Sequence, residues 1–267
     1  MPKNSTKNIL IIAGSDSCCG AGIQTDLKTA SKIGVYATTA ITCLTAQNSK
    51  KVAAISYVDP DFIVAQISAI ISDIKIDFIK IGMLGNGKII TKIANFLQKN
   101  AKNIPIILDP VMVATSGDLL LEESAIESLK NDLITNSYLI TPNIFEAEIL
   151  SSIKINNFDD IKKAAQKIQN LGIRNVLIKG GHCDFGPKNK IQNFLLEENG
   201  KKTTITNKKL HIGDTHGSGC TLSSAITSYL AQNNSLENSI RKANKFTYFA
   251  LKNSFKIGDG SLILKNF

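Results

Sequence analysis

A glycine-rich turn at residues 213–220, Gly-Asp-Thr-His-Gly-Ser-Gly-Cys, leads directly into an apolar segment with helical periodicity. One face of that segment carries Leu222, Ala225, Ile226, Tyr229 and Leu230. Such a turn presents unpaired backbone N–H groups and the positive end of the helix dipole, which together suit a phosphate group. Gly217, Ser218 and Gly219 are therefore candidate phosphate-stabilising residues, with Cys220 beside them. The alternative is a tight turn that only starts a core helix.

Lys179 is a second candidate for contact with phosphate. It follows an apolar strand expected over Val176–Ile178 and precedes Gly180, Gly181 and His182. A lysine at the carboxyl end of a strand can reach an anionic oxygen, and glycines beside it leave room for a ligand. The alternative is a solvated lysine in a glycine-rich turn.

Asp109 and Glu146 are candidate Mg²⁺ ligands. Asp109 ends an apolar strand, while Glu146 lies three residues after Asn143. The side chains of Asn143 and Glu146 face the same way if a helical turn begins at Pro142. Mg²⁺ bound to nucleotide phosphates usually keeps several waters and uses one or two carboxylates. The alternative for Glu146 is a first-turn glutamate that stabilises a helix dipole.

Asp26 and Gln47 form a further polar pair. Asp26 interrupts an otherwise amphipathic helical segment, and Gln47 comes just after a strand. A carboxylate and an amide together can recognise the donor and acceptor edge of a small heterocycle. Both residues are also common on ordinary protein surfaces.

Alternating strands and helices must position these residues. Strands are expected over Asn8–Ala13, Tyr36–Leu44, Phe78–Ile81, Ile104–Leu108, Tyr138–Ile140 and Val176–Ile178, and helices over Ala21–Ile33, Asp61–Ile74, Lys88–Gln98 and Asp159–Leu171. A hairpin is expected from Asn193–Leu196 and Thr203–Thr206, and two helices that begin near Gly219 and Ser235 close the chain.

This alternation predicts an α/β fold: a three-layer αβα sandwich with a mostly parallel central sheet and helices on both faces. Polar or glycine-rich clusters follow the apolar strands, and ligands bind beyond the carboxyl ends of such strands. We therefore expect the candidate residues to meet at one rim of the sheet. The sequence shows no linker or internal repeat, so residues 1–267 are expected to form one domain.

Composition narrows the class of protein. The net charge is +9, but only two arginines occur and the lysines are scattered, which disfavours a nucleic-acid-binding surface. The five cysteines include no CxxC pair, which disfavours zinc sites and a disulfide framework. No apolar run is long enough to span a membrane, and no signal peptide is evident, so a cytoplasmic enzyme is expected.

These motifs together resemble the hydroxymethylpyrimidine/phosphomethylpyrimidine kinases of thiamine biosynthesis, within the ribokinase-like superfamily. The resemblance runs along essentially the whole chain. Its ordered blocks are Ala13–Asp16, Gly20–Gln24, Asp26–Thr29, Thr45–Asn48, Lys80–Leu84, Leu108–Val113, Ser116–Asp118, Ile140–Asn143, Lys179–His182 and Thr215–Thr221. Cys220 is the most discriminating residue, because most related sugar kinases and pyridoxal kinases place an aspartate there.

The resemblance implies phosphorylation of 4-amino-5-hydroxymethyl-2-methylpyrimidine by ATP and Mg²⁺, and then of the resulting monophosphate to the diphosphate. It implies that Asp26 and Gln47 contact the pyrimidine and that Gly14, Thr45 and Met83 line its pocket. Nucleotide contacts are expected from Lys179, Thr215 and Asn143, and Mg²⁺ ligands from Asp109 and Glu146. A homodimer without nucleic-acid or membrane partners is expected. The alternative activity is that of a pyridoxal/pyridoxine kinase of the same superfamily.

Two further expectations concern cysteines. Cys220 begins a helix, an environment that lowers the pKa of a thiol, so a thiolate there is predicted to act as general base toward the alcohol of the first reaction. The second reaction has a phosphate as acceptor and needs no base. Cys18 and Cys19 stand where the family usually has at least one glycine, which predicts an altered loop near the substrate.

Overall fold

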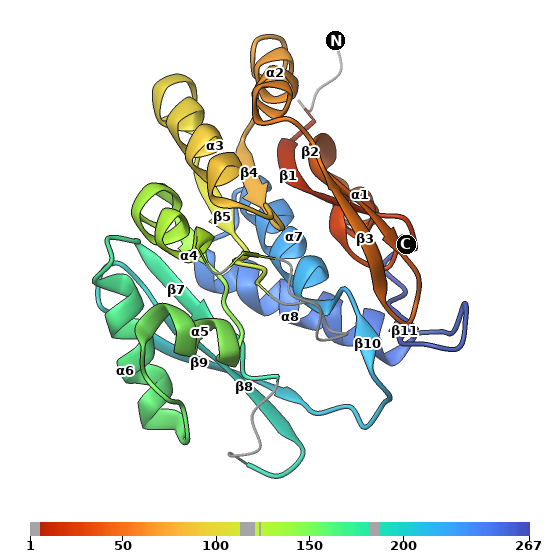
Figure 1. Cartoon of the computed structure of the whole chain (residues 1–267). Coiled ribbons are helices and arrows are strands. Elements are labelled where there is room, and N and C mark those ends of the chain that lie inside the picture. The colour runs from red at the N-terminus through yellow and green to blue at the C-terminus, as the bar shows by residue number, and fades with distance from the viewer. Residues whose placement is uncertain (1–5, 113–120, 123, 182–186) are drawn as a thin grey trace.

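The computed structural model describes residues 6–112, 121–122, 124–181 and 187–267 (Figure 1). Its strands are β1 (Asn8–Asp16), β2 (Tyr36–Gln47), β3 (Val52–Tyr57), β4 (Phe78–Ile81), β5 (Ile106–Leu108), β6 (Leu139–Ile140), β7 (Asn175–Ile178), β8 (Lys190–Leu196), β9 (Lys202–Lys208), β10 (Thr215–His216) and β11 (Leu262–Ile263). Its helices are α1 (Gly22–Ile33), α2 (Pro60–Ile71), α3 (Gly87–Asn100), α4 (Ala125–Ser128), α5 (Ile144–Ser151), α6 (Phe158–Gln169), α7 (Ser218–Ala231) and α8 (Leu236–Lys252). A π-helical turn over Leu129–Leu133 and a 3₁₀ turn over Ile134–Asn136 continue α4.

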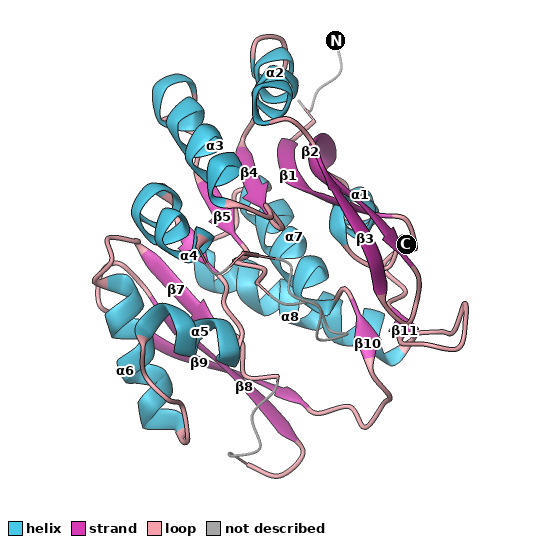
Figure 2. Ribbon diagram, in the orientation of Figure 1, coloured by secondary structure: helices cyan, strands magenta, loops and turns pink. Residues whose placement is uncertain are grey.

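A nine-stranded sheet runs through the molecule in the order β3-β2-β1-β4-β5-β6-β7-β8-β9. The strands from β2 to β7 in this order pair in parallel, whereas β3 at one edge and β8 and β9 at the other are antiparallel. Helices lie on both sides of the strands (Figure 2). This confirms the predicted αβα architecture and the predicted hairpin of β8 with β9.

The central strands are buried on both faces, which explains their continuous apolar sequence. Ile9 to Ile12 in β1 are each fully buried, and their side chains alternate between two cores. Leu10 and Ile12 belong to a core that also contains residues of α2, α3, α5 and α6. Ile9 and Ile11 face the opposite side, where α1 packs on the sheet and α7 and α8 cover the adjoining strands.

Some elements differ from the prediction. β2 extends through Gln47 rather than ending at Leu44, because β3 pairs with its second half. β3 itself was not expected: it is a largely exposed edge strand with no apolar alternation, so its conformation depends on pairing with β2. The predicted final helices are followed by β11, which pairs with β10.

The carboxyl ends of β1, β4, β5, β6 and β7 open on one rim, as predicted. Ser116–Asp118 and His182, which the sequence analysis singled out, lie outside the described residues. Within the described ranges, no helix combines the length and the apolar character needed to cross a membrane.

Candidate active site

A cavity of about 430 Å³ lies at this rim and extends from β2 to α8. Its wall includes most of the residues singled out from the sequence: Gly14, Thr45, Gln47, Met83, Asp109, Asn143, Glu146, Lys179, Thr215, Gly217, Ser218, Gly219 and Cys220. A volume of this size is typical of small-molecule sites. The fold therefore brings together residues that come from opposite ends of the chain.

The first turn of α7 forms one side of the cavity. Gly217 precedes the helix with a φ of 85°, and a Cβ atom there would overlap the carbonyl oxygen of Gly20. A Cβ on Gly219 would lie 3.3 Å from Lys179 Nζ and 3.6 Å from Asp109 Oδ2. The two glycines thus allow a left-handed turn and a close approach of polar side chains. Among the described residues, no side chain caps α7, so its first N–H groups can receive an anion.

Lys179 and Asp109 form an ion pair beside this turn. Lys179 Nζ donates to Asp109 Oδ1 at 2.8 Å, and the hydroxyls of Thr141 and Ser223 donate to the two oxygens of the carboxylate. Burial raises the pKa of Asp109, but Lys179 and Lys80 outweigh it and hold the pKa below its ordinary value. Asp109 is therefore a carboxylate, and Lys179 is an ammonium held at the cavity wall.

Glu146 and Asn143 form a capping box at the start of α5. The Asn143 side chain accepts from the Glu146 backbone N–H at 2.9 Å, and Glu146 Oε2 accepts from the Asn143 N–H at 2.7 Å. The helix-stabilising alternative for Glu146 is thus part of its role, although its side chain also lines the cavity. Burial raises the pKa of Glu146 to about 7, with Lys179 opposing and Asp109 adding to the rise.

The donor set fits a Mg²⁺ ion that arrives with nucleotide phosphates. Asp109 and Glu146 supply two carboxylates on the same cavity wall, which is the number such an ion uses when phosphates and waters complete its shell. Within the described ranges, no group of three or more His, Cys, Asp or Glu residues could hold a metal by itself. The residues present therefore suit a shared ion better than a closed protein site.

The structure corrects the expectation for Asp26. Its side chain is fully buried in α1, behind the cavity wall, and its two oxygens accept from Lys80 Nζ at 2.8 Å and from Ser224 Oγ at 2.6 Å. Lys80 is also fully buried. Since its oxygens point to these two partners, Asp26 anchors Lys80 and α7 and is not placed to touch a pyrimidine.

The predicted thiolate at Cys220 is wrong for the unliganded protein. Burial raises the pKa of the Cys220 thiol to about 11; Lys80 opposes this, while Asp26 and Asp109 add to it. The helix N-terminus and the neighbouring Gly22 N–H favour a thiolate, but they are outweighed. Cys220 is therefore a thiol at neutral pH, and Asp26 and Asp109 both disfavour its thiolate.

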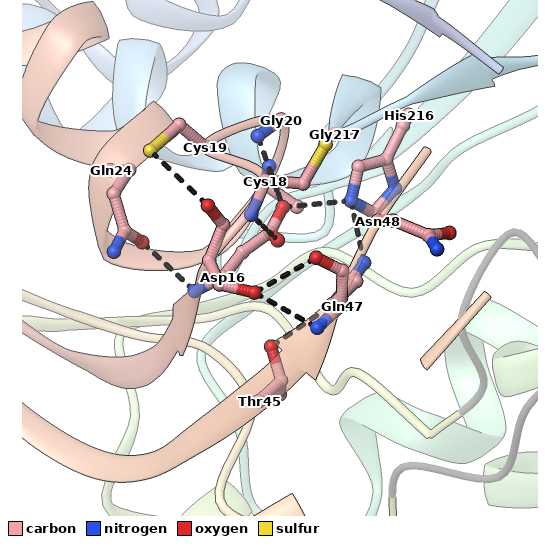
Figure 3. A network of polar contacts seen from close by, with 12 residues as sticks. Asp16, Cys18, Cys19, Gly20, Gln24, Thr45, Gln47, Asn48, His216 and Gly217 are labelled. Carbon is pink, nitrogen blue, oxygen red and sulfur yellow. Dashed lines mark hydrogen bonds and ion pairs between the residues drawn. The ribbon is translucent and has the colours of Figure 1, made fainter. Parts of the chain in front are cut away.

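The far end of the cavity carries a polar network that joins β1, β2 and β10 (Figure 3). Gln47 lies against Thr45 and His216, and His216 Nε2 is 3.0 Å from Asp16 Oδ2. Gly14 completes this wall with Met83; a Cβ on Gly14 would lie 3.3 Å from Met83 Sδ. An amide beside apolar surface suits a small, flat heterocycle.

Sequence reasoning missed Asp16, Lys80 and His216 as residues of the cavity wall. Each lies inside a block that carried the family resemblance. Lys80 also had a signal of its own, because a lysine within an apolar strand needs a buried partner. The sequence did not reveal which carboxylate would be that partner.

The Cys18-Cys19 loop adopts a conformation that glycine would reach more easily. Cys19 has a φ of 59°, in the left-handed region that costs about 1–2 kcal/mol for other residues. Asp16 holds the loop by accepting from the backbone N–H groups of Cys18, Gly20 and Ala21. The loop is therefore fixed from the cavity side despite the missing glycine.

Known proteins match the chain over most of its length. Residues 16–265 match the family model described as phosphomethylpyrimidine kinase. A hydroxymethylpyrimidine/phosphomethylpyrimidine kinase of Haemophilus influenzae is 40% identical over 257 residues, which cover 96% of this chain and 95% of that protein. A solved phosphomethylpyrimidine kinase from Clostridium difficile 630 is 40% identical with a TM-score of 0.80, covering 92% of this chain and 100% of that one. The pyridoxal kinase of Staphylococcus aureus in complex with ADP is 31% identical with a TM-score of 0.89, covering 98% and 94%.

Proposed function

The chain belongs to the phosphomethylpyrimidine kinase family, and we propose that its cavity performs two successive phosphoryl transfers from ATP. The first acceptor is the alcohol of 4-amino-5-hydroxymethyl-2-methylpyrimidine, and the second is the monophosphate that the first reaction forms. The observation that carries this proposal is that one cavity joins an uncapped helix N-terminus, the Lys179–Asp109 pair and the Gln47 amide.

In this proposal each part of the cavity has one task. Gln47 binds the edge of the pyrimidine ring, and Gly14, Thr45 and Met83 enclose the ring. The N–H groups of Gly217, Ser218 and Gly219 receive the oxygens of the transferred phosphoryl group, whose negative charge Lys179 also offsets. Thr215 and Asn143 line the nucleotide side.

A Mg²⁺ ion held by Asp109 and Glu146 would neutralise phosphate charge during the transfer. Lys179 can then exchange part of its contact with Asp109 for a phosphate oxygen, because both groups lie at the cavity wall. The two acceptors share this machinery, since both reactions move the same phosphoryl group from the same donor.

The two reactions differ in the proton of the acceptor. An alcohol must lose its proton, whereas a phosphate acceptor is already an anion. Cys220 is the proposed neighbour of the acceptor oxygen, and its thiol must itself be deprotonated before it can act as a base. Cys220→Ala is expected to slow the first reaction by ~10²–10³ and the second far less. Equal losses in both reactions would remove Cys220 from the proton transfer.

The test of the function is a coupled assay with the pyrimidine alcohol, its monophosphate and pyridoxal as parallel acceptors. Gln47→Leu should raise KM for the pyrimidine by roughly one to two decades and leave KM for ATP nearly unchanged. Gln98→Leu is the matched control, because Gln98 is exposed on α3 away from the cavity. An unchanged KM for the pyrimidine in Gln47→Leu would show that Gln47 does not bind the pyrimidine.

Pyridoxal kinase activity is the second candidate, favoured by the TM-score of 0.89 with the Staphylococcus aureus pyridoxal kinase. The same assay separates the two candidates. Phosphorylation of pyridoxal with no turnover of either pyrimidine would replace the first proposal with the second.

We also propose a homodimer formed through the β2–β3 edge. Leu44 and Tyr57 are large apolar residues, 51% and 41% exposed, on neighbouring strands of this edge. Light scattering after gel filtration should give twice the chain mass of 28.9 kDa. Leu44→Arg should give the monomer mass, and a wild-type monomer would contradict the proposal.

A further inference from the structure

The network around Gln47 limits which way round its side-chain amide can lie. As drawn in Figure 3, Gln47 Nε2 lies 2.9 Å from His216 Nε2 and Gln47 Oε1 lies 3.1 Å from Thr45 Oγ1. The two ends have nearly the same shape, so the hydrogen-bonding partners decide which is oxygen and which is nitrogen.

Asp16 decides the role of His216. Its carboxylate accepts from three backbone N–H groups and faces His216 Nε2 at 3.0 Å (Figure 3). A carboxylate that accepts from three backbone N–H groups is held in its ionised form. An ionised carboxylate accepts only, so His216 Nε2 must carry a hydrogen. The amide end beside that N–H must then be the oxygen.

Thr45 leads independently to the same orientation. Thr45 Oγ1 lies 3.0 Å from the Ser15 carbonyl oxygen, which can only accept. The single hydroxyl hydrogen of Thr45 therefore goes to Ser15, and Thr45 Oγ1 is left to accept from Gln47. The amide end beside Thr45 must then be the nitrogen.

We propose that Asp16 and His216 are positioning residues that fix the Gln47 amide with its oxygen toward His216 and its nitrogen toward Thr45, and so make the site selective for a 4-aminopyrimidine. The inference rests on the proposed function, in which Gln47 contacts the ring. The backbone of Gln47 is held as well, because its N–H donates to Ser17 Oγ and its carbonyl accepts from the same hydroxyl.

The fixed amide keeps one N–H and one oxygen lone pair for a ligand. These complement a ring nitrogen that accepts next to an exocyclic amine that donates. The amine then lies on the His216 side, and the hydroxymethyl group, which neighbours the amine on the ring, is directed toward the start of α7. The reversed amide would direct that group away from α7. Asp16 and His216 therefore select the pyrimidine ring and direct its hydroxymethyl group toward α7.

The test compares the 4-amino substrate with its 4-oxo analogue, whose ring N–H and carbonyl reverse the donor and acceptor. The wild type should prefer the 4-amino compound in kcat/KM by ~10² or more, because the analogue would leave buried polar groups opposed. His216→Leu removes the donor that holds the amide oxygen and leaves only the Thr45 contact, so this preference should fall at least ~10-fold. His216→Gln is the matched control: its amide N–H₂ can donate to both Asp16 and Gln47, so the preference should stay within about 3-fold.

Equal preferences in His216→Leu and wild type would overturn the proposal, as would equal losses in His216→Leu and His216→Gln. A second measurement needs no variant to fold: ¹⁵N NMR of the imidazoles in the wild type, which has three histidines. A protonated Nε2 in His216 is expected, and an unprotonated Nε2 overturns the proposal. Failure of the proposed function looks different, because the wild type would then phosphorylate neither pyrimidine, or Gln47→Leu would not change KM.

Discussion

Two lysine–aspartate pairs flank the first turns of α7. Lys80–Asp26 and Lys179–Asp109 have the same N–O distance of 2.8 Å. Their surroundings differ: both side chains of the first pair are 0% exposed, although Lys80 borders the cavity, whereas the Lys179 side chain is 14% exposed at the cavity wall. Ser224 completes the first pair, and the second has Glu146 as a further carboxylate nearby.

The two ion pairs serve different purposes in the fold. A fully enclosed pair cannot change partners, so Lys80–Asp26 holds β4, α1 and α7 in place. A pair at a cavity wall can exchange one contact for a ligand oxygen at little cost, which is what a phosphate-binding lysine needs. Position in the fold thus decides which pair is structural and which one the proposed reaction uses.

The largest expected effect is on the closed pair. Lys80→Met leaves the Asp26 carboxylate buried without its cation and should reduce the free energy of unfolding by about 3–5 kcal/mol. The double variant Lys80→Met/Asp26→Leu should recover most of this loss in urea unfolding. Lys92→Met is the control, because the Lys92–Asp61 pair is exposed and should cost under about 1 kcal/mol. A Lys80→Met loss as small as that of the control would remove the distinction between the pairs.

The same urea experiments test whether residues 1–267 form one domain, which remains a prediction. A single cooperative transition followed by two spectroscopic probes is expected, and two separate transitions would contradict it.

The open pair should affect turnover more than folding. Lys179→Met is expected to lower kcat in both phosphorylation steps by ~10²–10³, since a charge that offsets the transferred phosphoryl group is lost. Its effect on urea unfolding should be smaller than that of Lys80→Met, because Asp109 keeps hydrogen bonds from Thr141 and Ser223. Full activity in Lys179→Met would return Lys179 to the solvated-turn interpretation.

Protonation of Glu146, which lies near the open Lys179–Asp109 pair, should make the free energy of unfolding depend on pH. Its pKa is raised from 4.5 to about 7, so the folded state binds more protons than the unfolded state between these values. The neutral carboxyl therefore makes the free energy of unfolding about 3 kcal/mol higher below pH 4.5 than above pH 7. This contribution is lost as pH rises through 7. Glu146→Gln should unfold at higher urea than wild type at pH 8 and at nearly the same urea at pH 4.5. The same difference at both pH values would contradict the raised pKa.

The pKa of the Cys220 thiol depends on residues of both pairs, namely Lys80, Asp26 and Asp109. With its pKa raised to about 11, its thiolate fraction at pH 8 should be ~10²-fold below that of an ordinary cysteine. Alkylation by iodoacetamide, followed by mass spectrometry of each cysteine, should therefore be slow at Cys220. Cys19 is the internal reference because it is exposed. Equally fast alkylation of both cysteines would show that the pairs do not suppress the thiolate.

Much of the fold could be predicted because local patterns encode it. Apolar runs gave β4 with its observed bounds and placed β1, α1, α6 and α7 to within a few residues. β3 escaped prediction because its sequence carries no amphipathic pattern, and its neighbour β2 supplies the reason for its conformation. The position of Gln47 at the end of β2 depends on that pairing.

The sequence by itself determined the alternating elements, the order of the motifs along the rim and the family resemblance, because these depend on residue type and short spacing. Tertiary structure decided the partners. Asp26 meets Lys80 and Ser224 at separations of 54 and 198 residues, and His216 meets Asp16 across 200. Burial and electrostatic interaction act through space, so the enclosure of Asp26 and the raised pKa of Cys220 followed only from the folded chain.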